Sequence, residues 1–131
     1  MKKLTLLLLT ICIVFTHTGC GKSQKASDVD VDLTTMSSTM VYSYVADMLA
    51  NPSDYKGQLV RMEGDSNTTH GNTHSCIVYD ALGCCTEGIE YVLADAEEYP
   101  DDGDGITVVG TFATYKKGEG LYFVLIDAVL E

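Results

Sequence analysis

The fold is decided by the stretch Ile106-Thr-Val-Val-Gly-Thr-Phe-Ala-Thr-Tyr115. Its β-branched and aromatic residues are typical of a strand, and Gly110 in its middle is typical of a place where a sheet bends or bulges. Gly64 ends an earlier strand-like segment in the same way. The other segments with this composition, separated by Gly- and Asp-rich turns, are 58–64, 75–80, 88–94 and 121–130. The sequence therefore predicts a mainly β domain, a sheet of five strands closed into a small barrel.

One helix is predicted before these strands. Apolar residues recur at helical spacing from Val41 to Leu49, after a Ser/Thr-rich start and before a stop at Asn51-Pro52. The pattern predicts a helix over 37–50, which places the folded domain at 36–131.

The N-terminus has the pattern of a signal peptide. Lys2 and Lys3 precede an apolar run over 4–15, which is too short to cross the ~30 Å of a bilayer core. A polar segment follows the run and ends in Thr18-Gly19-Cys20, which resembles the lipobox of bacterial lipoproteins, although His17 stands where the lipobox usually has an aliphatic residue. The resemblance implies that residues 1–19 are removed and that Cys20 becomes the lipid-attached first residue. The alternative, secretion without lipid, would need small residues that this stretch supplies poorly.

A lipid on Cys20 would hold the protein at the outer face of the cell membrane. Each buried lipid methylene contributes ~0.8 kcal/mol, so two or three chains anchor a protein stably. Residues 20–35 are polar, with alternating Asp28, Asp30 and Asp32, and we expect them to form a flexible, disordered tether. Such a tether would span ~20 Å. The membrane is therefore the first expected partner.

The charge of the chain excludes one class of partner. The chain has 19 acidic and 8 basic residues, a net charge of −11, and removal of Lys2 and Lys3 would lower it to about −13. Nucleic-acid binding depends on neutralising phosphates with Lys and Arg, so we expect no nucleic-acid partner. A protein or a small ligand remains as the partner.

Two stretches resemble known bacterial proteins. The first, Asn51-Pro-Ser-Asp-Tyr-Lys-Gly-Gln-Leu-Val-Arg-Met-Glu-Gly64, is similar to the opening of envelope proteins with an OB-like barrel. The second, Cys84-Cys85-Thr-Glu-Gly-Ile-Glu90 with Tyr99-Pro100 and Val108-Val-Gly-Thr-Phe112, is similar to small uncharacterised lipoproteins of Gram-positive bacteria. The resemblance covers roughly residues 41–131 and implies an OB-like barrel and an anchored location, but no catalytic residue. Because 95–105 is too short for the helix that often lies there in an OB-fold, the helix at 37–50 is expected to cap the barrel.

Five residues are candidates for metal binding: His70, His74, Cys76, Cys84 and Cys85. If 75–80 and 88–94 form a hairpin, Cys84 and Cys85 lie at its tip. Cys76 then lies ~13 Å back along the strand and the histidines lie at the far end, so no metal site is favoured.

The same three cysteines are disulfide candidates, because the protein is expected outside the cell. Bridges from Cys76 to Cys84 or Cys85 are one possibility, and a Cys84–Cys85 bridge would be strained. The other interpretation is that some of these thiols fill core space as small apolar groups.

The sequence contains no convincing catalytic motif. It has no Ser/His/Asp arrangement or phosphate-binding glycine loop, and the acidic stretch 100–105 lacks the order of an EF-hand. We expect a non-enzymatic binding or interaction module without a cofactor. The alternative is a metal-binding or thiol-redox envelope protein that uses His74, Cys76, Cys84 and Cys85.

Overall fold

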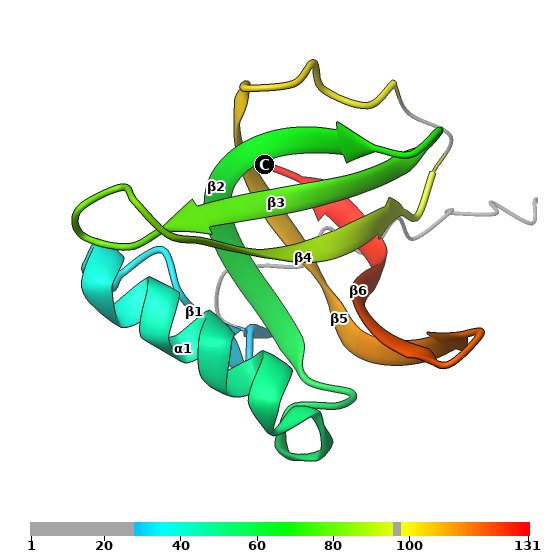
Figure 1. Ribbon diagram of the computed structural model, residues 1–131, viewed down its shortest axis with the longest axis horizontal. Helices are drawn as coiled ribbons and strands as arrows, with labels where there is room; N and C mark the ends of the chain where they lie inside the picture. The colour runs from blue at the N-terminus through cyan, green and yellow to red at the C-terminus, as the bar shows by residue number, and fades with distance from the viewer. Residues whose placement is uncertain (1–27, 96–97) are drawn as a thin grey trace, which may run out of the picture.

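The protein is described here by a computed structural model, which covers residues 28–95 and 98–131 (Figure 1). The predicted signal peptide and Cys20 lie outside the described residues. The described part is mainly β, with one α-helix and one six-stranded sheet. Its elements are β1 (Val31–Asp32), α1 (Ser38–Ala50), a 3-10 turn η2 (Pro52–Asp54), β2 (Leu59–Thr69), β3 (Thr73–Tyr79), β4 (Thr86–Leu93), β5 (Gly105–Lys117) and β6 (Gly120–Leu130). In this described part, no helix is both long and apolar enough to span a membrane.

The strand pairings form a closed circuit. The first half of β2 pairs with β5 and its second half pairs with β3, both antiparallel. From β3 the pairing continues to β4 (antiparallel), from β4 to β6 (parallel) and from β6 to β5 (antiparallel). The short β1 runs parallel to β2, with Val31 opposite Val60. The long β2 therefore belongs to both ends of the sheet, and it curves strongly in Figure 1.

Two glycines lie where the sheet must bend, as their positions in the sequence predict. Gly64 lies next to Asp65, the residue at which β2 passes from pairing with β5 to pairing with β3. A Cβ atom at Gly64 would lie 2.3 Å from the carbonyl oxygen of Ile77. Gly110 lies at the register shift between β5 and β6, where a Cβ atom would lie 2.9 Å from the Cβ of Leu125. Both positions need a residue without a side chain, because another segment of backbone or core packs directly on them.

The helix is confirmed, and it packs on the core. Ser37 is its N-cap and Asn51 its C-cap, as the stop at Asn51-Pro52 predicts. Val45 and Met48 are fully buried, and α1 contacts β3 and β4 (Figure 1, lower left). The described residues of 95–105 contain no helix. The core is made of residues from α1 and from all six strands or the segments beside them, the largest being Tyr91, Phe112, Leu33, Met48, Met62, Ile89 and Leu125.

The strand count is a correction to the sequence analysis. The five predicted strands correspond to β2–β6, but the sheet has a sixth strand, β1, within the segment predicted to be a disordered tether. That prediction is wrong for residues 31–33, because Val31 and Leu33 are 6% and 1% exposed and join the core. The alternating aspartates do not prevent this, since Asp30 accepts a hydrogen bond from the backbone N–H of Leu59.

A second correction concerns the length of β2. The sequence predicts that the first strand ends at Gly64 and that a polar loop follows. The strand instead continues to Thr69, which pairs with Thr73 across a tight turn. The turn is closed by His70 (φ +33°) and Gly71 (φ +91°). This part of the hairpin can be polar because most of its side chains remain partly accessible to water.

Candidate functional site

The first candidate site is the loop between β3 and β4, residues 80–85. Its conformation is held by Asp80, whose backbone N–H donates to the carbonyl of Cys85 (3.0 Å). The Asp80 carboxylate oxygen Oδ1 accepts hydrogen bonds from the backbone N–H groups of Cys84 (2.8 Å) and Cys85 (3.3 Å). Gly83, with φ +68°, makes the reversal of the chain possible. Asp80 therefore brings two neighbouring cysteines to one side of the hairpin tip.

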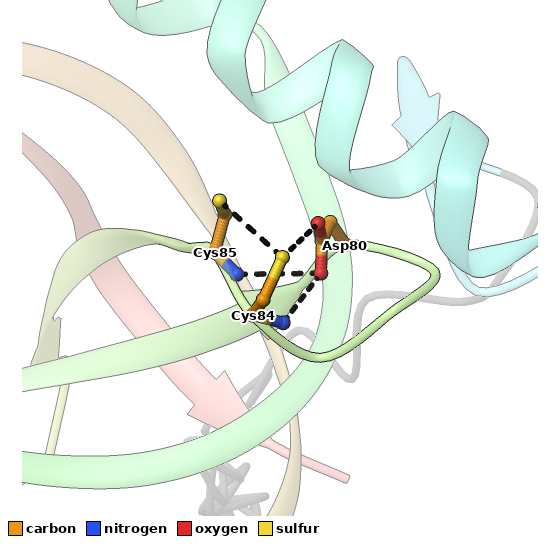
Figure 2. Close-up of side chains that lie close together, drawn as sticks. All are labelled: Asp80, Cys84 and Cys85. Carbon is orange, nitrogen blue, oxygen red and sulfur yellow. Dashed lines mark hydrogen bonds between the residues drawn. The ribbon is translucent and has the colours of Figure 1, made fainter.

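The two thiols lie beside the carboxylate (Figure 2). Cys84 Sγ donates a hydrogen bond to Asp80 Oδ2 at 3.2 Å, and it lies 3.8 Å from Cys85 Sγ. Both cysteines are exposed. The hydrogen bond to Asp80, followed by the one with Cys85, raises the pKa of the Cys84 thiol. The same bond from Cys84, together with the loop's backbone N–H groups, lowers the pKa of Asp80.

The structure separates the five metal-ligand candidates. Cys84 and Cys85 lie at the hairpin tip, as the hairpin model predicts. His74 lies at the other end of β3, where its ring stacks on Tyr99 with centroids 3.6 Å apart. His70 is exposed in the turn between β2 and β3. The structure therefore does not bring the histidines to Cys84 and Cys85.

Cys76 is separated from the other two cysteines by burial. It lies on β3 opposite Ile89, is 0% exposed, and has its pKa raised to about 12, mainly by burial. All three described cysteines are free thiols, so the structure contains none of the considered bridges from Cys76 to Cys84 or Cys85. The interpretation of a cysteine as a small apolar core residue fits Cys76.

A second candidate site is a groove of about 410 Å³ over the outer face of β4, β5 and β6. Its floor and walls are lined by Asn72, Thr73, His74, Glu90, Val92, Ala113, Thr114, Tyr115, Val124 and Ile126. Tyr115 donates a hydrogen bond to the Glu90 carboxylate (2.6 Å) and stacks on Tyr122, its partner across β5 and β6. This bond to Glu90 raises the pKa of Tyr115 to about 12. The groove thus combines exposed apolar side chains, the ring of Tyr115 and one carboxylate.

Sequence reasoning did not find Asp80 or the groove. The sequence predicts only that Asp80 ends a strand, although an Asp four residues before a Cys pair can accept hydrogen bonds from the backbone of the loop. The groove depends on the parallel pairing of β4 with β6, which local sequence does not specify. Comparison of the chain with protein-family models, with curated proteins and with solved structures found no match.

Proposed function

We propose that the protein is a membrane-anchored lipoprotein, held by a lipid on Cys20 at the extracytoplasmic face of the cell membrane. We further propose that β2–β6 form an OB-like barrel that acts as a non-enzymatic binding module. The anchor is supported by the basic, apolar and lipobox-like segments at the N-terminus. The binding role is supported by the groove.

The order of the strands supports the OB-like interpretation. The circuit β2-β3-β4-β6-β5-β2 uses five strands and returns to its first member, which is the arrangement of a small closed or nearly closed Greek-key barrel. Gly64 and Gly110 lie at bends in this circuit. On this interpretation β1 is an addition that pairs beside the start of β2.

The main observation in favour of a binding function is the position of the groove. OB-folds bind ligands on the second and third strands and on the loops between strands one and two and between strands four and five. These correspond here to β3, β4 and the turns before β3 and before β6. The groove takes residues from the turn before β3 and from β3, β4, β5 and β6. It is large enough for a small molecule or a short segment of a larger ligand.

The chemistry of the groove favours a neutral or cationic ligand with an apolar part. Val92 and Ile126 are 53% and 38% exposed, so they offer apolar surface that a ligand would cover. Tyr115 offers a ring face to a ligand, and Tyr faces attract cations. The charged group in the groove that is fixed by a hydrogen bond is the carboxylate of Glu90, which would repel an anion.

A metal or redox function that uses His74, Cys76, Cys84 and Cys85 together has less support. His74 and Cys76 lie on β3 and face the interior or the opposite end of the hairpin, away from Cys84 and Cys85. Such a function would have to use the hairpin tip alone.

The anchor is tested by substitution of Cys20. In cells fed a fatty acid that carries a clickable tag, the wild-type protein should become labelled and stay with the membrane fraction. Cys20→Ala should abolish the label and prevent cleavage after Gly19. Cys12→Ala is the matched control, because it removes a cysteine from the signal segment, and it should leave labelling unchanged. Labelling of the Cys20→Ala protein at the wild-type level would refute the lipid anchor.

The groove is tested by placing a charge in it. A ligand-observed NMR screen of neutral fragments with an apolar part against the chain from Gly21 onward should give binders, and Val92→Asp should weaken their binding by at least about tenfold, since it buries a carboxylate under an apolar ligand. Leu121→Asp is the matched control: Leu121 is also exposed (46%) but does not line the groove. An absence of binders, or binders that respond equally to both substitutions, would contradict a binding role for the groove.

A further inference from the structure

The geometry points to a metal site at the hairpin tip: we propose that Asp80, Cys84 and Cys85 bind one zinc-class divalent cation and leave a coordination position open. The inference does not depend on the lipid anchor or on the groove. It rests on the placement of three ligand atoms, on the way the loop fixes them, and on the charge around them.

The distances fit a tetrahedral ion. Zinc binds thiolate sulfur at ~2.3 Å, so two thiolates at a tetrahedral angle lie ~3.8 Å apart. The Sγ atoms of Cys84 and Cys85 are 3.8 Å apart. Asp80 Oδ2 lies 3.2 Å from Cys84 Sγ, and all three ligand atoms lie within 4.8 Å of one another. A carboxylate oxygen and a thiolate sulfur bound to one zinc ion lie ~3.6 Å apart, close to the 3.2 Å between Asp80 Oδ2 and Cys84 Sγ. Small shifts of the side chains would therefore let all three atoms bind one ion.

The loop fixes the carboxylate before any ion binds. Asp80 Oδ1 is occupied by the backbone N–H groups of Cys84 and Cys85, whereas Oδ2 faces the thiol of Cys84 (Figure 2). One oxygen therefore maintains the loop, and the other is free to exchange the thiol hydrogen bond for a metal bond. Groups that hold a ligand in this way raise the affinity of metal sites. Binding would release the two thiol protons to solvent, and both cysteines would become thiolate ligands.

The surroundings favour a cation over an anion. A hollow of about 350 Å³ lies beside the loop, between α1, β2 and β3, and Asp80 is part of its lining. Two further carboxylates, Glu63 and Asp65, line the same hollow. The pKa of Tyr42 on α1 is raised, first by burial and then by the negative charges of Cys85, Glu87 and Asp80. A divalent ion would be drawn to this acidic surface.

The number of protein ligands indicates whether a zinc site is structural or has an open coordination position. Structural zinc sites have four protein ligands, whereas sites with three keep a position for water or another ligand. Asp80, Cys84 and Cys85 supply three, and both cysteines are exposed. The bound ion would thus be exchangeable and accessible to a ligand from outside the protein, and it would not be a fixed part of the fold.

The test uses the mature protein, reduced, freed of metal and kept in mild detergent. One equivalent of Co²⁺ should produce thiolate-to-cobalt charge-transfer absorption, and one equivalent of Zn²⁺ should remove it. Loss of a residue that only hydrogen-bonds to a metal ligand typically weakens metal binding roughly 10–100-fold. Cys84→Ser and Cys85→Ser each remove a ligand itself, so each should weaken Zn²⁺ binding by more than this. Asp80→Asn, which keeps an oxygen that can accept the backbone hydrogen bonds, should retain the charge-transfer band but weaken binding by about tenfold.

The matched control is Glu119→Gln. It removes one negative charge from an exposed turn between β5 and β6, outside the cluster, so it should leave the affinity unchanged. Circular dichroism checks that every variant keeps the wild-type fold. The proposal is overturned if the wild-type protein shows no thiolate-to-cobalt band, or if any of Cys84→Ser, Cys85→Ser and Asp80→Asn binds Zn²⁺ as tightly as the wild type.

Discussion

Replacement of Gly64 by alanine is expected to destabilise the domain by at least about 3 kcal/mol, a large part of the ~5–15 kcal/mol that stabilises a domain of this size. The added Cβ atom would lie 2.3 Å from the carbonyl oxygen of Ile77 and 2.9 Å from Cys76 Sγ. The first of these contacts is with backbone, which cannot rotate away as a side chain can. Relief would require β2 to move away from β3 next to Asp65, where β2 changes partner from β5 to β3.

Gly105→Ala is the control for this experiment. Gly105 lies opposite Asp65 on β5, but a Cβ atom there would meet nothing within 4 Å, and its backbone conformation suits any residue. We expect a change within about 1 kcal/mol, and a small stabilisation is consistent with the lower entropy of the unfolded chain. Urea unfolding of the chain from Gly21 onward measures both variants. A Gly64→Ala midpoint equal to that of Gly105→Ala would show that β2 does not bend on Gly64.

The strands and their bends could be predicted because they depend on local composition. Five β-rich segments correspond to β2–β6, and Gly64 and Gly110 could be assigned to bends since a glycine inside a strand has few other roles. The sixth strand could not be predicted in this way. Although residues 28–33 alternate aspartate with an apolar residue, β1 itself is only two residues long, and the burial of Val31 and Leu33 depends on the edge of β2, which is distant in the sequence.

In the candidate sites, too, the features that depend on local sequence could be predicted and those that depend on loop conformation or distant contacts could not. The placement of Cys84 and Cys85 at a hairpin tip follows from the two strands around them, and the structure agrees. The role of Asp80 depends on the conformation of a loop with Gly83 at positive φ, and strand spacing does not encode that conformation. The groove requires Tyr115 to face Glu90, which is 25 positions away in the chain and on a strand that is not adjacent to β5.

The second large effect is expected at a nearly buried arginine. The Arg61 side chain is 9% exposed and lies between two carboxylates from distant parts of the chain. Its Nε and Nη2 donate to Glu131 at 2.9 and 2.8 Å, and its Nη1 donates to Asp32 at 3.1 Å. This cluster joins β1, β2 and Glu131, the residue that follows β6. A backbone hydrogen bond joins the same two segments, because the N–H of Leu33 donates to the carbonyl of Arg61.

Removal of the carboxylates should cost more than removal of the cation. The double variant Asp32→Asn/Glu131→Gln keeps the shapes of both side chains but leaves a nearly buried guanidinium without a counter-charge, which we expect to cost about 3 kcal/mol. Arg61→Met should cost about 1 kcal/mol, since Asp32 and Glu131 are 29% and 39% exposed and can be hydrated. Urea unfolding at pH 7 measures this difference. A double-variant loss no larger than that of Arg61→Met would contradict the expected cost of a guanidinium without a counter-charge.

The pH dependence of stability distinguishes the contribution of the Asp32 charge from that of side-chain packing. The pKa of Asp32 is lowered from 3.8, first by the hydrogen bond from the Thr34 hydroxyl. Burial is the second-largest effect and opposes this shift, and the Thr34 backbone N–H and Arg61 lower the pKa further. A carboxyl group whose pKa is lower in the folded state stabilises the fold above its unfolded pKa, and this contribution disappears as the pH falls through the folded pKa. The wild type should therefore lose stability below about pH 4 more steeply than Asp32→Asn. Parallel curves for the two proteins between pH 5 and about pH 2 would show that the Asp32 carboxylate does not contribute as a charge.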